Sequence, residues 1–416
     1  MRFSIFTTLP PVGRSPDQVL RNFREQVVLA EELGFHAVWI GEHHFQPFGG
    51  GDLPNAILIG ADIAARTSRI RIGQMANIAV WWHPIRLAED LAILDNLTEG
   101  RIEVGFGRGI RGYEGPQFHP NADPRTEENR ALFVETIEIV KKAWTEEFFA
   151  HDGENYRFPA PETRFSHPMY PVNPEWQDGD RVIRLRVTPK PYQKPHPPLW
   201  ATVSTDRSVS MAAEMGMKAC YWQPPVKRIA ERCRVYAEVR SRLEGRRFAF
   251  GEGQAIMRGT YVAGSMEEAR RDAEAGMVSL FAHNQSMRGM QIFLDPGETI
   301  DADTRLDWDF LEPRSFLVGS PAHVVERLEE HREVCNPEEI LIGYAHDGID
   351  QKKTLRNIER FGTEVMPHFR NAGMNRLSAD TVPARIGFGG TGHPALRIGR
   401  PEEVLERAGR EARRSD

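Results

Sequence analysis

Short apolar segments alternate with longer amphipathic segments along most of the chain, and this alternation constrains the fold more than any other feature. Repeated strand–helix units form a parallel sheet with right-handed crossovers, and eight such units favour a closed barrel. We therefore predict an α/β fold, a (β/α)8 TIM barrel with insertions. The eight strands are expected at residues 2–8, 36–41, 69–78, 101–106, 198–203, 217–222, 254–263 and 338–343. Helices are expected at 16–33, 55–66, 84–98, 125–147, 206–215, 225–243, 266–280, 321–333 and 350–366.

Two stretches interrupt the alternation, at about 151–198 and 284–318. The chain has 416 residues, which is longer than the roughly 250 residues typical of such a barrel. We expect one barrel over residues 1–370, with two aromatic-rich insertions that cover the mouth of its pocket and set specificity. Residues 371–416 are expected to form a C-terminal extension. Its glycine-rich piece at 386–392 does not have the spacing of a dinucleotide-binding loop.

Composition excludes several classes of function. The formal net charge of −6 gives no reason to expect binding to nucleic acid or to an anionic membrane. No apolar run approaches the roughly 20 residues of a membrane span, and the N-terminus is not typical of a secretory signal. The three cysteines, Cys220, Cys233 and Cys335, show neither metal-ligand spacing nor a disulfide framework. A cytoplasmic protein is therefore expected.

Polar side chains follow several predicted strands at the point where each strand ends. The apolar run 37–40 leads directly into Glu42, His43 and His44, and Asn77 lies at the end of the third strand. In an α/β barrel the loops at the carboxyl ends of the strands build the active site. Imidazole titrates near neutral pH and can hold or pass a proton. From the residues alone, a metal-ligand pair or a structural pair of histidines remains open.

A second group of residues predicts a phosphate site. Arg108 follows the fourth strand within the segment Gly105–Gly109, and Arg130 opens the next helix. Hydroxyls at a helix start, with free backbone N–H groups, favour an anion. The hydroxyls in question follow the fifth strand, at Ser204, Thr205 and Ser208. Each feature has an ordinary alternative, because Ser and Thr commonly cap helices and arginines commonly form ion pairs. Together they predict one phosphate bound across the fourth and fifth strand–helix loops.

The order and spacing of these motifs resemble the bacterial luciferase-like family of flavin-dependent monooxygenases. The resemblance extends over most of residues 1–370. It is carried by segments 37–45 (AVWIGEHHF), 83–90 (HPIRLAED), 94–95, 100–109 (GRIEVGFGRG), 129–131, 204–208, 212–213 and 319–327 (GSPAHVVER). The fold of this family is a (β/α)8 barrel with insertions, which agrees with the strand count.

The resemblance implies a cofactor, a co-substrate and partners. Reduced FMN, supplied by a separate NAD(P)H-dependent flavin reductase, would react with O2 to give a C4a-peroxyflavin that transfers one oxygen atom. A homodimer is the family expectation. The resemblance also implies that Arg108, Arg130, Ser204, Thr205 and Ser208 hold the FMN phosphate. Luciferases carry a glutamate where this chain has Ser204, which leaves more positive charge around the phosphate.

The resemblance further implies roles at the reacting centre. The flavin would lie over a non-proline cis peptide whose counterpart is Met75–Ala76, next to Asn77. His43 and His44 are the catalytic candidates. His43 matches the catalytic histidine of the luciferases, whereas His44 is expected to be mainly structural and Glu42 to be a hydrogen-bond anchor.

The predicted substrate pocket is apolar. Two adjacent tryptophans in an extended segment would point opposite ways, so both cannot belong to one core. Apolar pockets bind apolar ligands. We therefore expect a small hydrophobic organic substrate, such as a terpenoid, a polyketide, or an aliphatic aldehyde or ketone, changed by hydroxylation or Baeyer–Villiger insertion. The residues expected to line the pocket are Phe6, Trp81, Trp82, Tyr221 and Trp222.

Three alternative functions remain. A deazaflavin (F420)-dependent oxidoreductase of the same superfamily would use the same basic site for hydride transfer, without O2. A non-catalytic flavin-binding protein would not require the two histidines. A metal hydrolase using His43 and His44 would need a third ligand, and the sequence shows none at suitable spacing.

Overall fold

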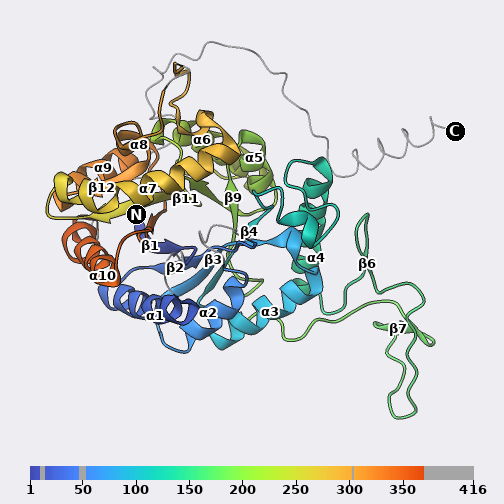
Figure 1. The fold of residues 1–416 in the computed structure, drawn as a ribbon. Coiled ribbons are helices and arrows are strands. Elements are labelled where there is room, and N and C mark those ends of the chain that lie inside the picture. Colours follow the sequence, from blue (N-terminus) through green and yellow to red (C-terminus); the bar gives the residue numbers. More distant parts are fainter. Residues whose placement is uncertain (10–14, 46–52, 302–303, 370–416) are drawn as a thin grey trace. The chain divides into compact units, whose positions relative to one another are not determined.

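The computed structural model describes residues 1–9, 15–45, 53–301 and 304–369. In this part of the chain, eight parallel strands pair in the order β10-β9-β4-β3-β2-β1-β13-β11, and the ring closes because β10 also pairs with β11 (Figure 1). The strands are β1 (Arg2–Thr7), β2 (Ala37–Ile40), β3 (Arg71–Ile78), β4 (Ile102–Gly107), β9 (Leu199–Val203), β10 (Lys218–Trp222), β11 (Gln254–Val262) and β13 (Glu339–Gly343). The predicted TIM barrel is confirmed, with all eight strands at the expected places.

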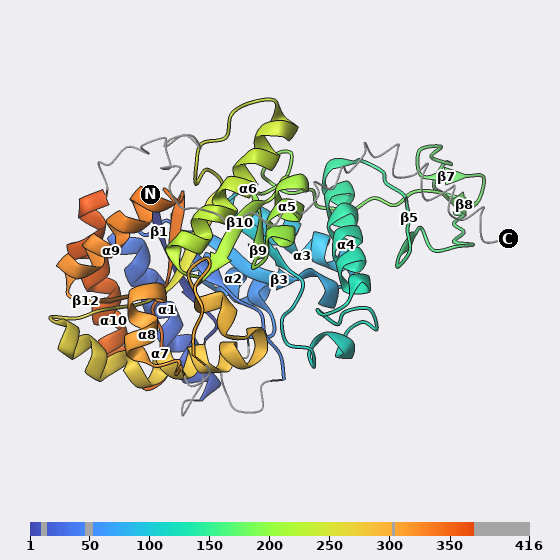
Figure 2. The same cartoon turned by 90° about the horizontal axis from the view of Figure 1, so that it is seen from above.

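Helices pack around the ring of strands, as the view from above shows (Figure 2). They are α1 (Pro16–Leu33), α2 (Ala56–Ala64), α3 (Pro84–Leu97), α4 (Glu127–Thr145), α5 (Asp206–Glu214), α6 (Val226–Glu244), α7 (Met266–Arg288), α8 (Trp308–Ser315), α9 (Pro321–Val334) and α10 (Gln351–Arg360). Helix α1 ends as predicted at Gly34, whose φ of 84° suits glycine and whose N–H donates to Ala30 and Glu31. The last predicted helix is less regular, because α10 gives way to a π-helical turn (Phe361–Val365) and a 3₁₀ turn (Met366–Phe369).

The barrel interior is filled by large side chains. Trp39 and Trp200 meet edge to face, with ring centroids 5.5 Å apart. Gly73 makes room for Trp39, because a Cβ at residue 73 would lie 2.2 Å from the indole. Near the amino-terminal ends of the strands, buried carboxylates accept the two indole N–H groups, Glu339 from Trp39 at 2.8 Å and Glu103 from Trp200 at 2.6 Å. This packing fills the barrel interior toward the amino-terminal ends of the strands.

The first insertion is built differently from the barrel. It contains two small hairpins, β5 (His151–Asp152) with β6 (Arg157–Phe158), and β7 (Gln177–Asp178) with β8 (Arg181–Val182). Phe158 packs against His83 at the start of α3, with ring centroids 5.5 Å apart. Gln193, in contrast, donates to the carbonyl of Ile102 at the start of β4. Because β4 starts at the amino-terminal end of the barrel, this later part of the insertion does not cover the mouth of the pocket.

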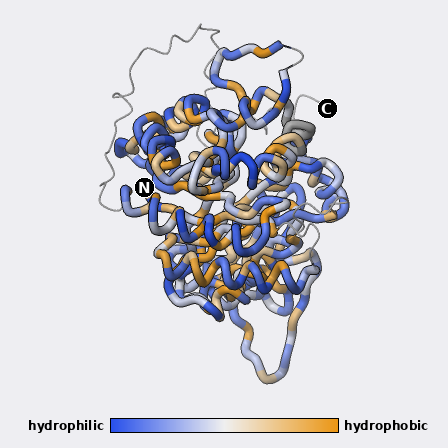
Figure 3. The backbone as a smooth tube through the Cα atoms, turned by 60° about the vertical axis from the view of Figure 1, so that its left-hand side comes forward, coloured by the Kyte–Doolittle hydropathy of each residue, from blue (hydrophilic) through white to orange (hydrophobic). Residues whose placement is uncertain are grey.

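The second insertion, 284–318, is more ordered than the irregular stretch that the sequence predicted. After α7 come a 3₁₀ turn (Met290–Phe293), α8 and the strand β12 (Phe316–Gly319), which pairs with the carboxyl end of β11. The eight-residue helix α8 contains Pro313, and β12 has only four residues, so neither has a clear periodic pattern. Along the longer helices, in contrast, polar and apolar residues alternate visibly (Figure 3).

The predicted extension 371–416, with its glycine-rich piece at 386–392, lies outside the described residues. Among the described helices, none is long and apolar enough to cross a membrane.

Candidate active site

The predicted site residues lie at the carboxyl ends of four neighbouring strands. His43 and His44 follow β2, and Asn77 is the second-last residue of β3. Arg108 follows β4 and Ser204 follows β9. These strands are adjacent in the order β9-β4-β3-β2. The predicted position at strand ends is thus present, and these strand ends are neighbours in the barrel.

Glu42 anchors the segment after β2. One carboxylate oxygen accepts the backbone N–H of Ile78 at 2.7 Å, and the indole N–H of Trp82 lies 3.0 Å from the other. The same second oxygen lies 3.2 Å from Nε2 of His44. Burial raises the pKa of Glu42, and these hydrogen bonds oppose that effect. These contacts agree with the anchoring role expected for Glu42.

The two histidines have different surroundings. The His44 ring contacts Glu42 and packs edge to face against Trp81 and Phe118, with centroids 5.2 and 4.7 Å away. The His43 side chain is 23% exposed, against 12% for His44. His44 is thus held on several sides, as a structural residue would be, whereas His43 is the more accessible imidazole.

A buried ion pair that the sequence analysis did not select lies behind His43. Glu114 Oε1 accepts the backbone N–H of His44 at 2.8 Å and lies 3.4 Å from His43 Nδ1. The same oxygen lies 3.4 Å from Nη1 of Arg111. Glu114 is fully buried and Arg111 is nearly so. The Arg-x-x-Glu spacing directly after the Gly-Arg-Gly segment is the only signal in the sequence that points to this pair.

Three guanidinium groups gather near the ends of β4 and β9. Arg108 donates to the side-chain oxygen of Asn129 at 2.9 Å. Arg130 pairs with Glu127 at 3.2 Å, and Arg207 donates two hydrogen bonds to the same carboxylate, at 2.8 and 2.6 Å. Burial and the nearby Arg130 lower the pKa of Arg108 to about 10, so it stays charged at neutral pH. Arg130 and Arg207 thus share one carboxylate and Arg108 bonds a neutral amide, which leaves a net charge of about +2 on the three arginines and Glu127.

Arg207 was missing from the predicted site, although it stands inside the segment 204–208 that the sequence singled out. Its role depends on Glu127, which lies 80 residues earlier in the sequence. Sequence spacing alone does not reveal that pairing.

The hydroxyls after β9 cap helix α5. Thr205 Oγ1 accepts the N–H of Ser208, and Ser208 Oγ accepts the N–H groups of Ser204 and Thr205 at 3.0 and 2.9 Å. The ordinary capping alternative is therefore present in the structure. A phosphate at this place would have to share these N–H groups with Ser208.

The cis peptide predicted in the third strand is present, whereas Gly105 of the glycine-rich segment has a structural explanation. The Met75–Ala76 peptide bond is cis, as predicted, and the register of β3 against β4 shifts between Gln74 and Asn77. Gly105 serves strand pairing rather than a ligand, because a Cβ there would lie 2.2 Å from the carbonyl oxygen of Gln74. Met75 lies in the apolar cluster of the barrel interior.

Of the five predicted pocket residues, Phe6, Trp222 and Trp81 lie in the barrel interior or beside His44. Phe6 and Trp222 are partly buried and pack on the apolar cluster inside the barrel. Trp81 stacks on Phe118, with ring centroids 5.5 Å apart. However, the premise about the two tryptophans is wrong, because strand β3 ends at Ile78 and residues 79–81 form a 3₁₀ turn.

Tyr221 is a wrong prediction. Its neighbours Cys220 and Trp222 face the barrel interior, so strand alternation turns Tyr221 to the other face. There it lies near Cys233 of α6, and its hydroxyl donates to Gln254 at 2.6 Å. Tyr221 is fully buried between strands and helices and does not line the barrel mouth.

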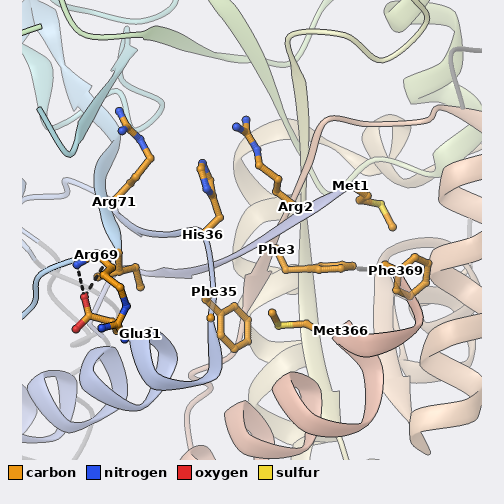
Figure 4. A pocket seen from close by; sticks show the side chains of 12 residues that line it. Met1, Arg2, Phe3, Glu31, Phe35, His36, Arg69, Arg71, Met366 and Phe369 are labelled. Carbon is orange, nitrogen blue, oxygen red and sulfur yellow. Dashed lines mark hydrogen bonds between the residues drawn. The ribbon is translucent and has the colours of Figure 1, made fainter. Parts of the chain in front are cut away.

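A cavity of about 550 Å³ lies at the opposite end of the barrel (Figure 4). Its wall includes Phe3, His36 and Arg71, which lie at or just before the starts of β1, β2 and β3. The Arg71 guanidinium is paired with Glu103 at 2.7 Å. The cavity is therefore far from the strand ends that carry the candidate site. Among the described residues, no group of three histidine, cysteine or acidic side chains could hold a metal ion.

Comparisons with known proteins agree with this geometry. The chain is 26% identical over 395 residues to the oxygenase component of the flavin-dependent trigonelline monooxygenase of Acinetobacter baylyi, covering 91% of this chain and 98% of that one. Two solved structures share the fold. The oxygenating constituent of 3,6-diketocamphane monooxygenase from Pseudomonas putida, in complex with FMN, has a TM-score of 0.70 at 23% identity, covering 88% and 98% of the two chains. An F420-dependent secondary alcohol dehydrogenase has a TM-score of 0.64 at 14% identity, covering 89% and 99%.

The profile of the family described as luciferase-like monooxygenase matches residues 1–335. That range includes the histidine pair, the arginine cluster and all barrel strands except β13. The chain therefore belongs to the luciferase-like monooxygenase family.

Proposed function

We propose that this chain is the oxygenase component of a two-component monooxygenase. It takes reduced FMN from a separate NAD(P)H-dependent flavin reductase and uses O2 to oxygenate a hydrophobic organic substrate, by hydroxylation or Baeyer–Villiger insertion. The observation that carries the proposal is the cluster of Arg108, Arg130 and Arg207, in which Arg108 bonds Asn129 and the single carboxylate of Glu127 pairs with Arg130 and Arg207.

The cluster fits the phosphate of FMN in charge and in donors. A net charge of about +2 matches a phosphate dianion, and guanidinium groups bind phosphate through paired N–H donors. Nη1 of Arg130 is buried and has no hydrogen-bond partner in the described part of the chain, so it is a donor available to an anion. Arg108, Arg130 and Arg207 would hold the phosphate, with Ser204 beside them. Bound reduced flavin would supply the reaction with O2.

His43 is the residue that would act on a proton at the reacting centre. It follows β2 at the barrel mouth and is the more exposed of the two imidazoles. A neutral imidazole accepts a proton and an imidazolium donates one, so His43 can serve a hydroxyl or carbonyl group of the substrate. His44 and Glu42 would fix the loop that carries it.

Aromatic side chains support an apolar substrate. Trp81 and Phe118 stack, and Phe118 also stacks on Phe45 with ring centroids 5.6 Å apart. Phe45 and Phe118 are 54% and 39% exposed, which leaves an apolar surface next to the histidines. Such a surface binds apolar groups and excludes water from the site. A small, charged acid would be a poor substrate.

The proposal is tested by cofactor choice. Under anaerobic conditions, the purified chain is titrated separately with reduced FMN, reduced riboflavin and reduced F420. We expect FMN to bind roughly 100-fold more tightly than riboflavin, since the phosphate meets at least two charge-assisted donors. Equal affinity for FMN and riboflavin would contradict the phosphate assignment. Tighter binding of F420 than of FMN, with hydride transfer in the absence of O2, would replace the monooxygenase with an F420-dependent oxidoreductase.

A further inference from the structure

Glu114 stands out because one of its oxygens serves three groups. Oε1 accepts the N–H of His44 and faces both Nδ1 of His43 and Nη1 of Arg111. Oε2 is buried and has no hydrogen-bond partner among the described residues. Leaving a buried carboxylate oxygen without a donor has a free-energy cost of about 1–3 kcal/mol. Glu114 therefore combines one unpartnered oxygen with the approach of its other oxygen to an imidazole, which suggests a role beyond packing.

The contact with His43 has a defined geometry. Nδ1 of His43 is buried and has no hydrogen-bond partner within the described part of the chain, and the nearest carboxylate oxygen, Oε1 of Glu114, lies 3.4 Å away. A carboxylate accepts hydrogen bonds and donates none. The proton of a neutral His43 ring is therefore favoured on Nδ1, where it faces Glu114. Nε2, the other ring nitrogen, then carries the lone pair and can accept a proton.

Two other charged groups, Arg111 and Glu42, lie close to the segment that carries His43. Arg111 approaches the same oxygen of Glu114 and offsets its charge. Glu42 contacts His44, on the same segment as His43, and not His43 itself. The carboxylate that lies next to His43 is thus shared with a guanidinium.

We propose that Glu114, balanced by Arg111, is a positioning residue that holds the Nδ1–H tautomer of His43 and presents Nε2 to the substrate. The catalytic part of this inference rests on the proposed function of His43. The tautomer part rests only on the described contacts, so the two can fail separately.

The tautomer is measured by two-dimensional ¹⁵N–¹H NMR on the full chain labelled at histidine ring nitrogens, without cofactor and at a pH where the ring is neutral. The signals of His43 are identified by their loss in His43→Asn. We expect the wild-type ring to carry its proton on Nδ1. A wild-type ring with its proton on Nε2 would overturn the proposal, and the only variant needed is the one that assigns the signals.

Variants then test whether Glu114 is the cause. Glu114→Gln keeps an acceptor oxygen at the same place, so the Nδ1–H tautomer should persist. Glu114→Met removes the acceptor at similar size and should move His43 to a mixture with at least half Nε2–H. Glu42→Gln is the matched control, because it should alter the signals of His44 and leave those of His43 in place. An unchanged His43 tautomer in a folded Glu114→Met protein would overturn the proposal.

Turnover distinguishes this inference from the proposed function. With reduced FMN and a substrate that the wild-type chain oxygenates, Glu114→Met should lower kcat by roughly 10–100-fold and leave KM within about two-fold. This is the result expected for a misoriented proton carrier. If His43→Ala keeps full turnover, the proposed role of His43 fails, while the tautomer result still decides the contact with Glu114.

Discussion

Replacing Arg130 with alanine tests the arginine cluster most sharply. Arg130 contributes one of three positive charges, and its side chain is only 21% exposed. A charge-assisted hydrogen bond contributes about 1.5–3 kcal/mol, and about 1.4 kcal/mol corresponds to a tenfold change in affinity. Arg130→Ala should therefore weaken FMN binding by roughly 10–100-fold. Its partner Glu127 is 67% exposed and keeps both hydrogen bonds from Arg207, so loss of the pair should cost little stability and the variant should fold.

The assay is an anaerobic titration that follows flavin fluorescence for FMN and for riboflavin. Riboflavin lacks the phosphate, so its affinity should change by less than about two-fold in Arg130→Ala. Arg66→Ala is a control, because Arg66 just after α2 forms an ion pair with Asp62 outside the arginine cluster. Its FMN affinity should equal that of the wild type.

Removing the negative charge of Glu127 should change FMN affinity in the opposite direction, which is an independent check on the role of charge. Glu127 is 67% exposed, and Arg207 and Arg130 lower its pKa, so it is a carboxylate at neutral pH. Glu127→Gln frees both guanidinium groups and should tighten FMN binding by about 2-fold to 5-fold, as is typical for an exposed charge. The reasoning is refuted if Arg130→Ala and Glu127→Gln bind FMN as the wild type does, or if riboflavin is affected as strongly as FMN.

Three further predictions concern a buried carboxylate, the two histidines and the source of electrons. Burial raises the pKa of Glu103, and its hydrogen bonds and cationic neighbours lower it more, to about 2. Its carboxylate therefore contributes stability that is present above pH 5 and is lost as the pH falls toward 2. Chemical unfolding across this range should show a flatter pH dependence for Glu103→Gln, and an unchanged profile would contradict the assignment. His43→Ala should lower turnover by roughly 10²–10⁴-fold with FMN binding near normal, whereas His44→Ala should mainly lower the melting temperature; the reverse result would mean that the wrong imidazole was chosen. The purified chain with FMN and NADH or NADPH should consume nicotinamide negligibly in a spectrophotometric assay, and rapid consumption without a reductase would refute the two-component scheme.

The barrel and the strand-end residues could be predicted because they depend on local patterns. Each buried strand is a short apolar run, and the residue after it falls at the barrel mouth whichever strand it belongs to. This rule located His43, Asn77 and Arg108 before any contact was known. The rule has no such power inside the irregular segments, where α8 and β12 are too short for periodicity.

The errors and omissions have physical causes of the same kind. Tyr221 was placed in the pocket from its position near a strand end, but alternation along β10 turns it toward α6. Trp81 and Trp82 were treated as extended, whereas a 3₁₀ turn sets their directions. Glu114 was missed because its role depends on a contact with His43 across 71 positions of sequence, and that contact exists only in the folded barrel.

The central claim is that the chain inserts one atom of O2 into an apolar organic molecule by means of reduced FMN. The most direct measurement supplies reduced FMN from a generic flavin reductase, ¹⁸O2 and a panel of terpenoids, polyketides, aliphatic ketones and short charged acids, and analyses the products by mass spectrometry. We predict that at least one apolar compound gains a single ¹⁸O atom, only when the chain is present. Products that contain no ¹⁸O, or faster turnover of the charged acids than of every apolar compound, would contradict this account.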